Sequence, residues 1–108
     1  MAYWLALAGA IALEIAGTVS MKLSHGFTRA VPSALLFVFY GLSFALMTIA
    51  VKRIDMSVSY AIWSGVGTAT IALIGVGWFR ESLTPLQVAS IVAIIAGVAG
   101  LRAGAADS

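Results

Sequence analysis

The chain carries very little charge and no cysteine. Only 9% of its 108 residues are charged and 62% are hydrophobic, whereas soluble domains typically have about 25% charged residues. Without cysteine there is no disulfide framework and no thiolate metal site, and one histidine with four acidic residues argues against a zinc site. The six basic residues are scattered and form no run of the kind that binds nucleic acid. We therefore expect a membrane protein with no metal, no cofactor and no nucleic-acid partner.

Four long stretches that are almost free of charge make up most of the sequence. Glu14 is the only charged residue between positions 2 and 21, and segments 30–51, 56–79 and 82–101 carry no charge at all. Each has roughly the 20 residues that a helix needs to cross a bilayer, and none shows the short alternating pattern of a barrel strand. The sequence predicts one all-α transmembrane domain over residues 1–108, with helices at roughly 3–22, 31–51, 57–79 and 85–102.

The connections between these spans divide the basic residues evenly between the two sides of the membrane. Four crossings place Lys52, Arg53 and Arg102 on the side of the N-terminus, and Lys22, Arg29 and Arg80 on the other. An excess of Lys and Arg normally keeps one side in the cytoplasm, so three against three gives the insertion machinery no clear instruction. We interpret this balance as insertion in both orientations; the alternative is that another feature fixes one orientation.

Local signals mark some of the helix ends. Thr84 followed by Pro85 is typical of a helix start, with the threonine as N-cap. Asp55 or Ser57 is expected to cap the third helix in the same way. His25 lies in a connection beside a glycine and is expected to be a surface residue.

Glu14 is the strongest functional signal. A carboxylate in the middle of a span is costly, and such residues nearly always face a partner or a water-filled cavity. No basic residue of the sequence is expected at the same depth. Such a carboxylate can release a proton to admit a cation and take one up to expel it. The alternative is a protonated Glu14 that only hydrogen-bonds neighbouring helices.

Other candidate site residues lie on helical faces at a similar depth. They are small or hydroxyl residues (Gly17, Thr18 and Ser43) and aromatic residues (Tyr40, Tyr60 and Trp63). Positions 17 and 18 share a face with Glu14, because residues three and four apart are neighbours on a helix. Aromatic ring faces attract cations, so together with Glu14 these side chains predict a cage for a lipophilic cation. Taken singly, each aromatic residue is equally well explained by helix packing.

Small residues mark two further features of the later spans. Gly65 and Gly67 fall within the third span and are expected to kink it, although they would also suit a packing groove. Ser90, Gly97 and Gly100 form a small-residue face on the fourth span, where close packing in a dimer interface is the expected role. No nucleophile–base pair is visible, so we expect no enzymatic activity.

Several motifs together resemble those of a known family. They are the segments 13–18, 21–22, 26–29 and 32–33 and, above all, Tyr-Ala-Ile-Trp-Ser-Gly-Val-Gly at 60–67. Across essentially its whole length the chain is similar to the small multidrug resistance family of bacterial proton-coupled exporters. The resemblance implies an antiparallel homodimer in the bacterial inner membrane, in which Glu14 binds protons and organic cations in competition. It further implies that Tyr60 and Trp63 are binding-site aromatics, that Tyr40 and Ser43 lie near the site, and that Gly17 and Thr18 match the multidrug subtype.

Three positions bear on which branch of the family the chain resembles. Ala16 stands where the guanidinium-exporting subtype has a tryptophan, which favours an exporter of lipophilic or quaternary cations. Ser90 replaces a glycine that is common on the fourth helix. The segment 52–57 resembles members that work as unequal pairs, some of them polyamine exporters. The alternative is therefore a guanidinium or polyamine (spermidine) exporter of the same family, either by itself or as one half of a heteromeric pair. A non-transporting accessory subunit would leave Glu14 and the deep aromatic residues unexplained.

Overall fold

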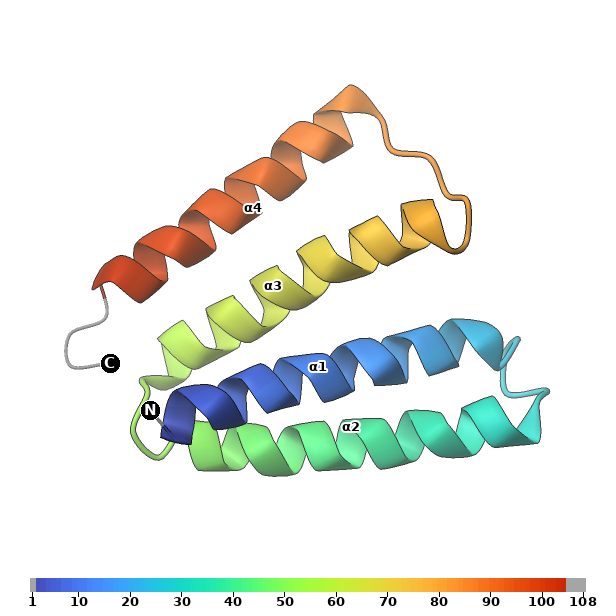
Figure 1. Ribbon diagram of the computed structural model, residues 1–108, viewed down its shortest axis with the longest axis horizontal. Helices are drawn as coiled ribbons and strands as arrows, with labels where there is room; N and C mark the ends of the chain where they lie inside the picture. The colour runs from blue at the N-terminus through green and yellow to red at the C-terminus, as the bar shows by residue number, and fades with distance from the viewer. Residues whose placement is uncertain (1, 105–108) are drawn as a thin grey trace.

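Four helices form the computed structural model, which describes residues 2–104 (Figure 1). They are α1 (Ala2–Leu23), α2 (Ala30–Ala50), α3 (Met56–Gly77) and α4 (Pro85–Gly104), and the described residues contain no strand. All four are long and apolar enough to cross a membrane. The predicted all-α, four-span fold is confirmed, and no helix end differs from the expected one by more than two residues.

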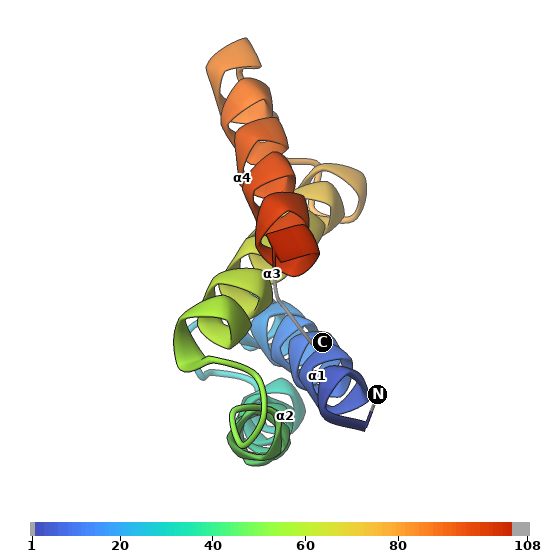
Figure 2. The same ribbon diagram turned by 90° about the vertical axis from the view of Figure 1, so that its left-hand side faces the viewer.

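The helices lie in the spatial order α2, α1, α3, α4 (Figures 1 and 2). α1 packs along α2 on one side and against α3 on the other, and α4 packs chiefly against α3. The start of α1, the α2–α3 connection and the end of α4 lie at one end of the molecule, which we call the N-terminal end; the α1–α2 and α3–α4 connections lie at the opposite end (Figure 1). The chain therefore crosses from end to end four times, as the charge pattern predicted.

The buried core is small and lies where α1, α2 and α3 meet. Its buried apolar residues are Leu7, Ile11, Ala50, Ile54 and Ile62. α4 contains no buried residue. In a bilayer, exposed apolar side chains face lipid or another helix, so α4 offers most of its surface to one of these two.

The two predicted N-caps have different outcomes. The Thr84 N–H donates to Gln87 Oε1 over 2.8 Å, and the Gln87 N–H donates to Thr84 Oγ1 over 3.2 Å, which confirms the expected N-cap and makes it a reciprocal capping box. Asp55 occupies the N-cap position of α3 but makes no side-chain cap hydrogen bond. Ser57 lies inside the helix, because α3 already begins at Met56. The expected side-chain cap of α3 is wrong.

Candidate functional site

A short chain of hydrogen bonds holds one oxygen of Glu14. Thr18 Oγ1 donates to Glu14 Oε1 over 2.9 Å, and the hydroxyl oxygens of Thr18 and Tyr40 are 2.6 Å apart. Thr18 has a single hydroxyl proton. Because that proton goes to Glu14, Tyr40 must donate its own proton to Thr18. The chain of bonds runs from α2 to α1 and fixes the direction in which the carboxylate points.

The other oxygen of Glu14 has no partner. Oε2 is buried and makes no hydrogen bond within the described residues. It faces Gly67 on α3, where an added Cβ would lie only 2.9 Å from it. The one ion pair in the described part of the chain joins Lys22 to Glu81 and does not involve Glu14. A buried polar atom without a partner is costly, and a proton or a cation on this oxygen would remove that cost.

Glu14 lines a cavity between α1 and α3. The cavity has a volume of about 440 Å³, within the usual range of small-molecule sites. Its walls include Thr18 from α1, Trp63, Gly67 and Thr68 from α3, and Glu81 from the α3–α4 connection. The structure thus brings Glu14, Thr18 and Trp63 together, as expected.

Gly17 and Ser43 lie between helices and do not border open space. A Cβ at Gly17 would be 2.7 Å and 2.8 Å from two ring carbons of Tyr40, so the glycine makes room for that ring. Ser43 is fully buried, and its hydroxyl donates to the Ala10 carbonyl over 2.6 Å. Neither residue lines the Glu14 cavity. In a single chain both residues serve the packing of α1 on α2, and the expected contact of Ser43 with substrate has no support in this geometry.

The predicted aromatic residues form a row that joins α2 to α3. Ring centroids are 6.4 Å apart for Tyr40 and Phe44, 6.4 Å for Phe44 and Trp63, and 5.3 Å for Trp63 and Tyr60. Trp63 is partly buried, and its indole Nε1 has no partner within the described residues. Tyr60 is 59% exposed and does not line the cavity. One end of the row is therefore Tyr40, which is hydrogen-bonded to Thr18, and the other end is Tyr60, which lies at the surface of the single chain.

Among the residues of this region that sequence reasoning missed, four are aromatic or polar. Phe44 completes the aromatic row, and its position four residues after Tyr40 was a usable signal. Ser59 is fully buried with an unpaired hydroxyl, one helical turn before Trp63. Thr68 and Glu81 line the cavity. Nothing in the sequence pattern pointed to Glu81, which belongs to a connection.

The small residues of α3 and α4 differ in what they contact. α3 continues as a helix through Gly65 and Gly67, and both are buried. A Cβ at Gly65 would come within 2.5 Å of Val98 Cγ2, so this glycine allows α4 to approach α3. A Cβ at Gly97 or Gly100 would meet nothing within 4 Å. The kink and the dimer face, which also includes the exposed Ser90, stay predictions.

Four membrane spans with a half-paired carboxylate facing a cavity are the features expected of a small membrane transport protein. The model of the family described as Small Multidrug Resistance protein matches residues 2–94. The chain belongs to this family, whose members are transporters in the membrane.

Relatives with high identity agree with this assignment. The chain is 51% identical over 99 residues to the membrane protein YvaE of Bacillus subtilis. This match covers 92% of this chain and 83% of YvaE. It is 44% and 43% identical over 89 residues to the multidrug resistance proteins EbrA of Bacillus licheniformis and Bacillus atrophaeus. Each of these matches covers 82% of this chain and 85% of the relative. The chain is therefore a multi-pass protein of the bacterial inner membrane.

Proposed function

We propose that the protein is a proton-coupled antiporter that exports aromatic or quaternary organic cations across the bacterial inner membrane and works as an antiparallel homodimer. One observation carries the proposal. Glu14 Oε2 is buried, lacks a partner within the described residues and belongs to a side chain that lines a cavity. A carboxylate in such a position binds whatever positive charge can reach it.

Competition at Glu14 couples the two fluxes. Thr18 holds Oε1 in place, so Oε2 is the oxygen that a proton or a cation neutralises. The two ligands exclude one another because each removes the same negative charge. A proton arriving from the acidic side therefore expels the bound cation, and the loss of that proton on the other side admits the next one. The proton gradient drives export.

The aromatic row favours large cations with diffuse charge. Such cations lose little hydration free energy on leaving water, and the faces of tryptophan and tyrosine rings attract them. Trp63 places an indole at the wall of the Glu14 cavity. The word multidrug in the names of the EbrA relatives supports this substrate class. We expect binding in the micromolar range, an affinity of about −8 kcal/mol.

Two features support a dimer of oppositely inserted chains. Basic residues are divided three against three between the two ends, so neither orientation is favoured. One chain leaves apolar and aromatic surface uncovered, since α4 has no buried residue and Tyr60 is mostly exposed. A second chain packed on these surfaces would bury them and bring a second Glu14 into the same assembly.

Transport by purified protein in proteoliposomes tests the proposal. With the unaltered protein in the membrane, proteoliposomes that are more acidic inside than outside should take up tetraphenylphosphonium, an aromatic quaternary cation, as protons leave. Glu14→Gln should fold normally and lose all proton-driven uptake, because glutamine cannot exchange a proton. Glu14→Asp should still bind the cation but with a changed pH optimum.

The matched control is Asp55→Asn, which removes a carboxylate outside the membrane spans. This variant should transport at the wild-type rate. Proton-driven uptake by Glu14→Gln at the wild-type rate would show that the carboxylate is only structural. Selective transport of guanidinium, or of spermidine only with a second, different chain, would replace the proposed substrate class.

A further inference from the structure

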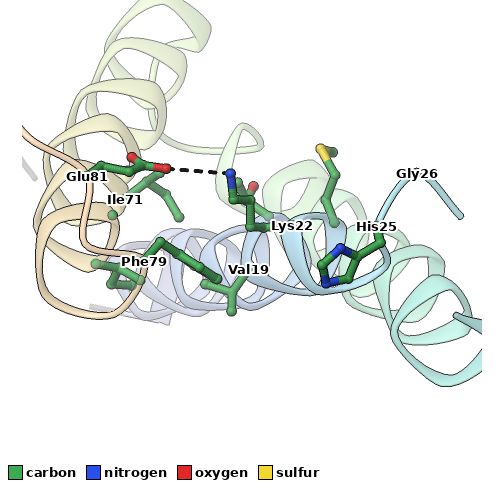
Figure 3. A pocket seen from close by; sticks show the side chains of 11 residues that line it. Val19, Lys22, His25, Gly26, Ile71, Phe79 and Glu81 are labelled. Atoms are coloured by element: carbon green, nitrogen blue, oxygen red, sulfur yellow. Dashed lines mark ion pairs between the residues drawn. The ribbon is translucent and has the colours of Figure 1, made fainter. Parts of the chain in front are cut away.

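A second cavity lies at the end of the molecule formed by the α1–α2 and α3–α4 connections (Figure 3). Its volume is about 570 Å³, and its lining includes Lys22, His25, Phe79 and Glu81. Thr18, Ile71 and Glu81 also line the Glu14 cavity, so the two cavities adjoin. A cation that approaches Glu14 from this end passes Glu81 first.

Lys22 already places a positive charge in this outer cavity. Its Nζ lies 3.7 Å from Glu81 Oε2 and 5.8 Å from the centroid of the Phe79 ring. Figure 3 shows Lys22 reaching toward Glu81 across the cavity. The ammonium group therefore lies between a carboxylate and an aromatic face, which is the environment that an organic cation would seek. Both side chains of the pair are more than half exposed (59% and 53%). Ion pairs so exposed contribute little, so another cation can replace Lys22 at small cost.

The backbone around Glu81 adds to the negative potential. α1 ends at Leu23 and α3 ends at Gly77, so the outer cavity lies at two helix C-termini, whose carbonyl groups carry partial negative charge. The Glu81 N–H bonds the Gly75 carbonyl over 2.9 Å. The Glu81 carboxylate lies against Gly75, where an added Cβ would collide with it. The carboxylate is thus held beside the C-terminus of α3. The partial negative charge of this helix end attracts a cation and repels a carboxylate that has no cation beside it.

We propose that Glu81 and Phe79 form an outer cation site that receives organic cations before they reach Glu14, and that Lys22 is a resident counterion which the substrate displaces. The inference rests on the proposed function, because it assigns a place on the substrate's path. In this arrangement Lys22 competes with the substrate and Glu81 attracts it.

Opposite effects of two charge-removing variants test the outer site. We expect Glu81→Gln to raise the KM for tetraphenylphosphonium uptake about three- to tenfold with an unchanged maximal rate, since charged clefts raise association rates by about tenfold or more. Lys22→Gln should lower the KM. Both differences should shrink as ionic strength rises, because salt screens exposed charges. A purely structural ion pair would make the two variants change in the same direction, and that result would overturn the proposal.

Arg80→Gln is the matched control for Lys22→Gln. It removes a basic residue from the same end of the molecule, so it changes the charge balance that governs insertion equally. Arg80 lines neither cavity. Its variant should keep the wild-type KM, and a lowered KM there would attribute the Lys22 effect to topology and overturn the inference.

Binding to the Glu14→Gln variant separates the outer site from the proposed function. With the inner carboxylate removed, tetraphenylphosphonium should still bind weakly and in a salt-sensitive manner, and adding Glu81→Gln should abolish this binding. Absence of any binding to the Glu14→Gln variant would refute the outer site even if the unaltered protein transports. Failure of the unaltered protein to transport would refute the proposed function instead, while the binding measurement would still decide on the outer site.

Discussion

Replacing Gly17 with alanine should disconnect Tyr40 from Thr18. The new Cβ would lie 2.7 Å from Cδ1 and 2.8 Å from Cε1 of the Tyr40 ring, whereas carbon atoms without a bond rest at least about 3.5 Å apart. The rigid ring must therefore move away from α1 by roughly 0.8 Å. The two hydroxyl oxygens, now 2.6 Å apart, would then separate beyond the roughly 3.0 Å limit for a hydroxyl–hydroxyl bond.

The size of the effect follows from these contacts. Overpacking of a well-filled site costs about 1–3 kcal/mol of folding free energy. Loosening the bonds that orient Glu14 should weaken cation binding by about 1.4 kcal/mol, which is tenfold in Kd. Purified protein in detergent provides both readouts: thermal unfolding followed by circular dichroism, and equilibrium binding of tetraphenylphosphonium.

The same substitution elsewhere on α1 is the control. A Cβ at Gly9 would come within 2.9 Å of Leu46 Cδ1 alone, the far end of a flexible side chain that can turn aside. Gly9→Ala should therefore be neutral or stabilise the helix by up to about 1 kcal/mol. In a Tyr40→Ala background the obstacle is gone, so Gly17→Ala should cause no further loss of binding. If Gly17→Ala were as harmless as Gly9→Ala in the unaltered background, the close approach of α1 and α2 described above would be wrong.

Other expected outcomes concern the site, the topology and a helix end. Thr18→Val should weaken tetraphenylphosphonium binding by about 1.5–3 kcal/mol by removing a hydrogen bond to a charged group; calorimetry giving an unchanged Kd would contradict the bond. Trp63→Ala should weaken the same binding by about 1–2 kcal/mol through loss of a ring face. C-terminal reporter fusions should show both orientations in comparable amounts, and one or two added lysines should bias them; a single orientation in the unaltered chain would exclude the antiparallel homodimer. Thr84→Ala should lower the unfolding free energy by about 1 kcal/mol, which Thr84→Ser should largely restore.

The fold could be predicted because a bilayer excludes charge strongly. Apart from Glu14, charged residues within the helices are confined to the last turns, at Lys22 of α1 and Arg102 of α4, so each helix contains an uncharged stretch of sufficient length. Helix ends are set by weaker contacts, and there the predictions were less successful. Thr84 caps α4 because Gln87 stands three residues later and returns the bond. Asp55 has no such partner at the start of α3 and leaves the helix uncapped by a side chain.

Of the candidate site, only the contacts within a single helix could be predicted from the sequence. The contact of Glu14 with Thr18 follows from their spacing of four residues. The bond from Tyr40 depends on how α2 lies along α1, which no pattern within either helix reveals. For the same reason the sequence could not distinguish a serine that faces a ligand from Ser43, whose hydroxyl bonds the opposite backbone.

The position of Glu81 in the cavity wall could not be predicted from the sequence for a different reason. It follows Arg80, which adopts a positive φ of 57°. A non-glycine residue rarely adopts this conformation, and no sequence pattern predicts it at Arg80. The Glu81 N–H also bonds back to Gly75 and draws the connection over the end of α3. Side chains placed by such turns become visible only in the structure.

The hydrogen bonds of Glu14 also bear on how the chain enters the membrane. Both residues of its hydrogen-bond chain, Thr18 and Tyr40, lie on α1 and α2, and the same two helices are joined by the buried bond of Ser43 to Ala10. During synthesis this hairpin emerges from the ribosome before α3 and α4. A carboxylate is costly to transfer into lipid. Here the hydroxyl groups of Thr18 and Tyr40 belong to the same hairpin as Glu14 and enter the membrane together with it. The first two helices can therefore enter the membrane with one carboxyl oxygen of Glu14 already hydrogen-bonded, and α3 then covers the other oxygen at Gly67.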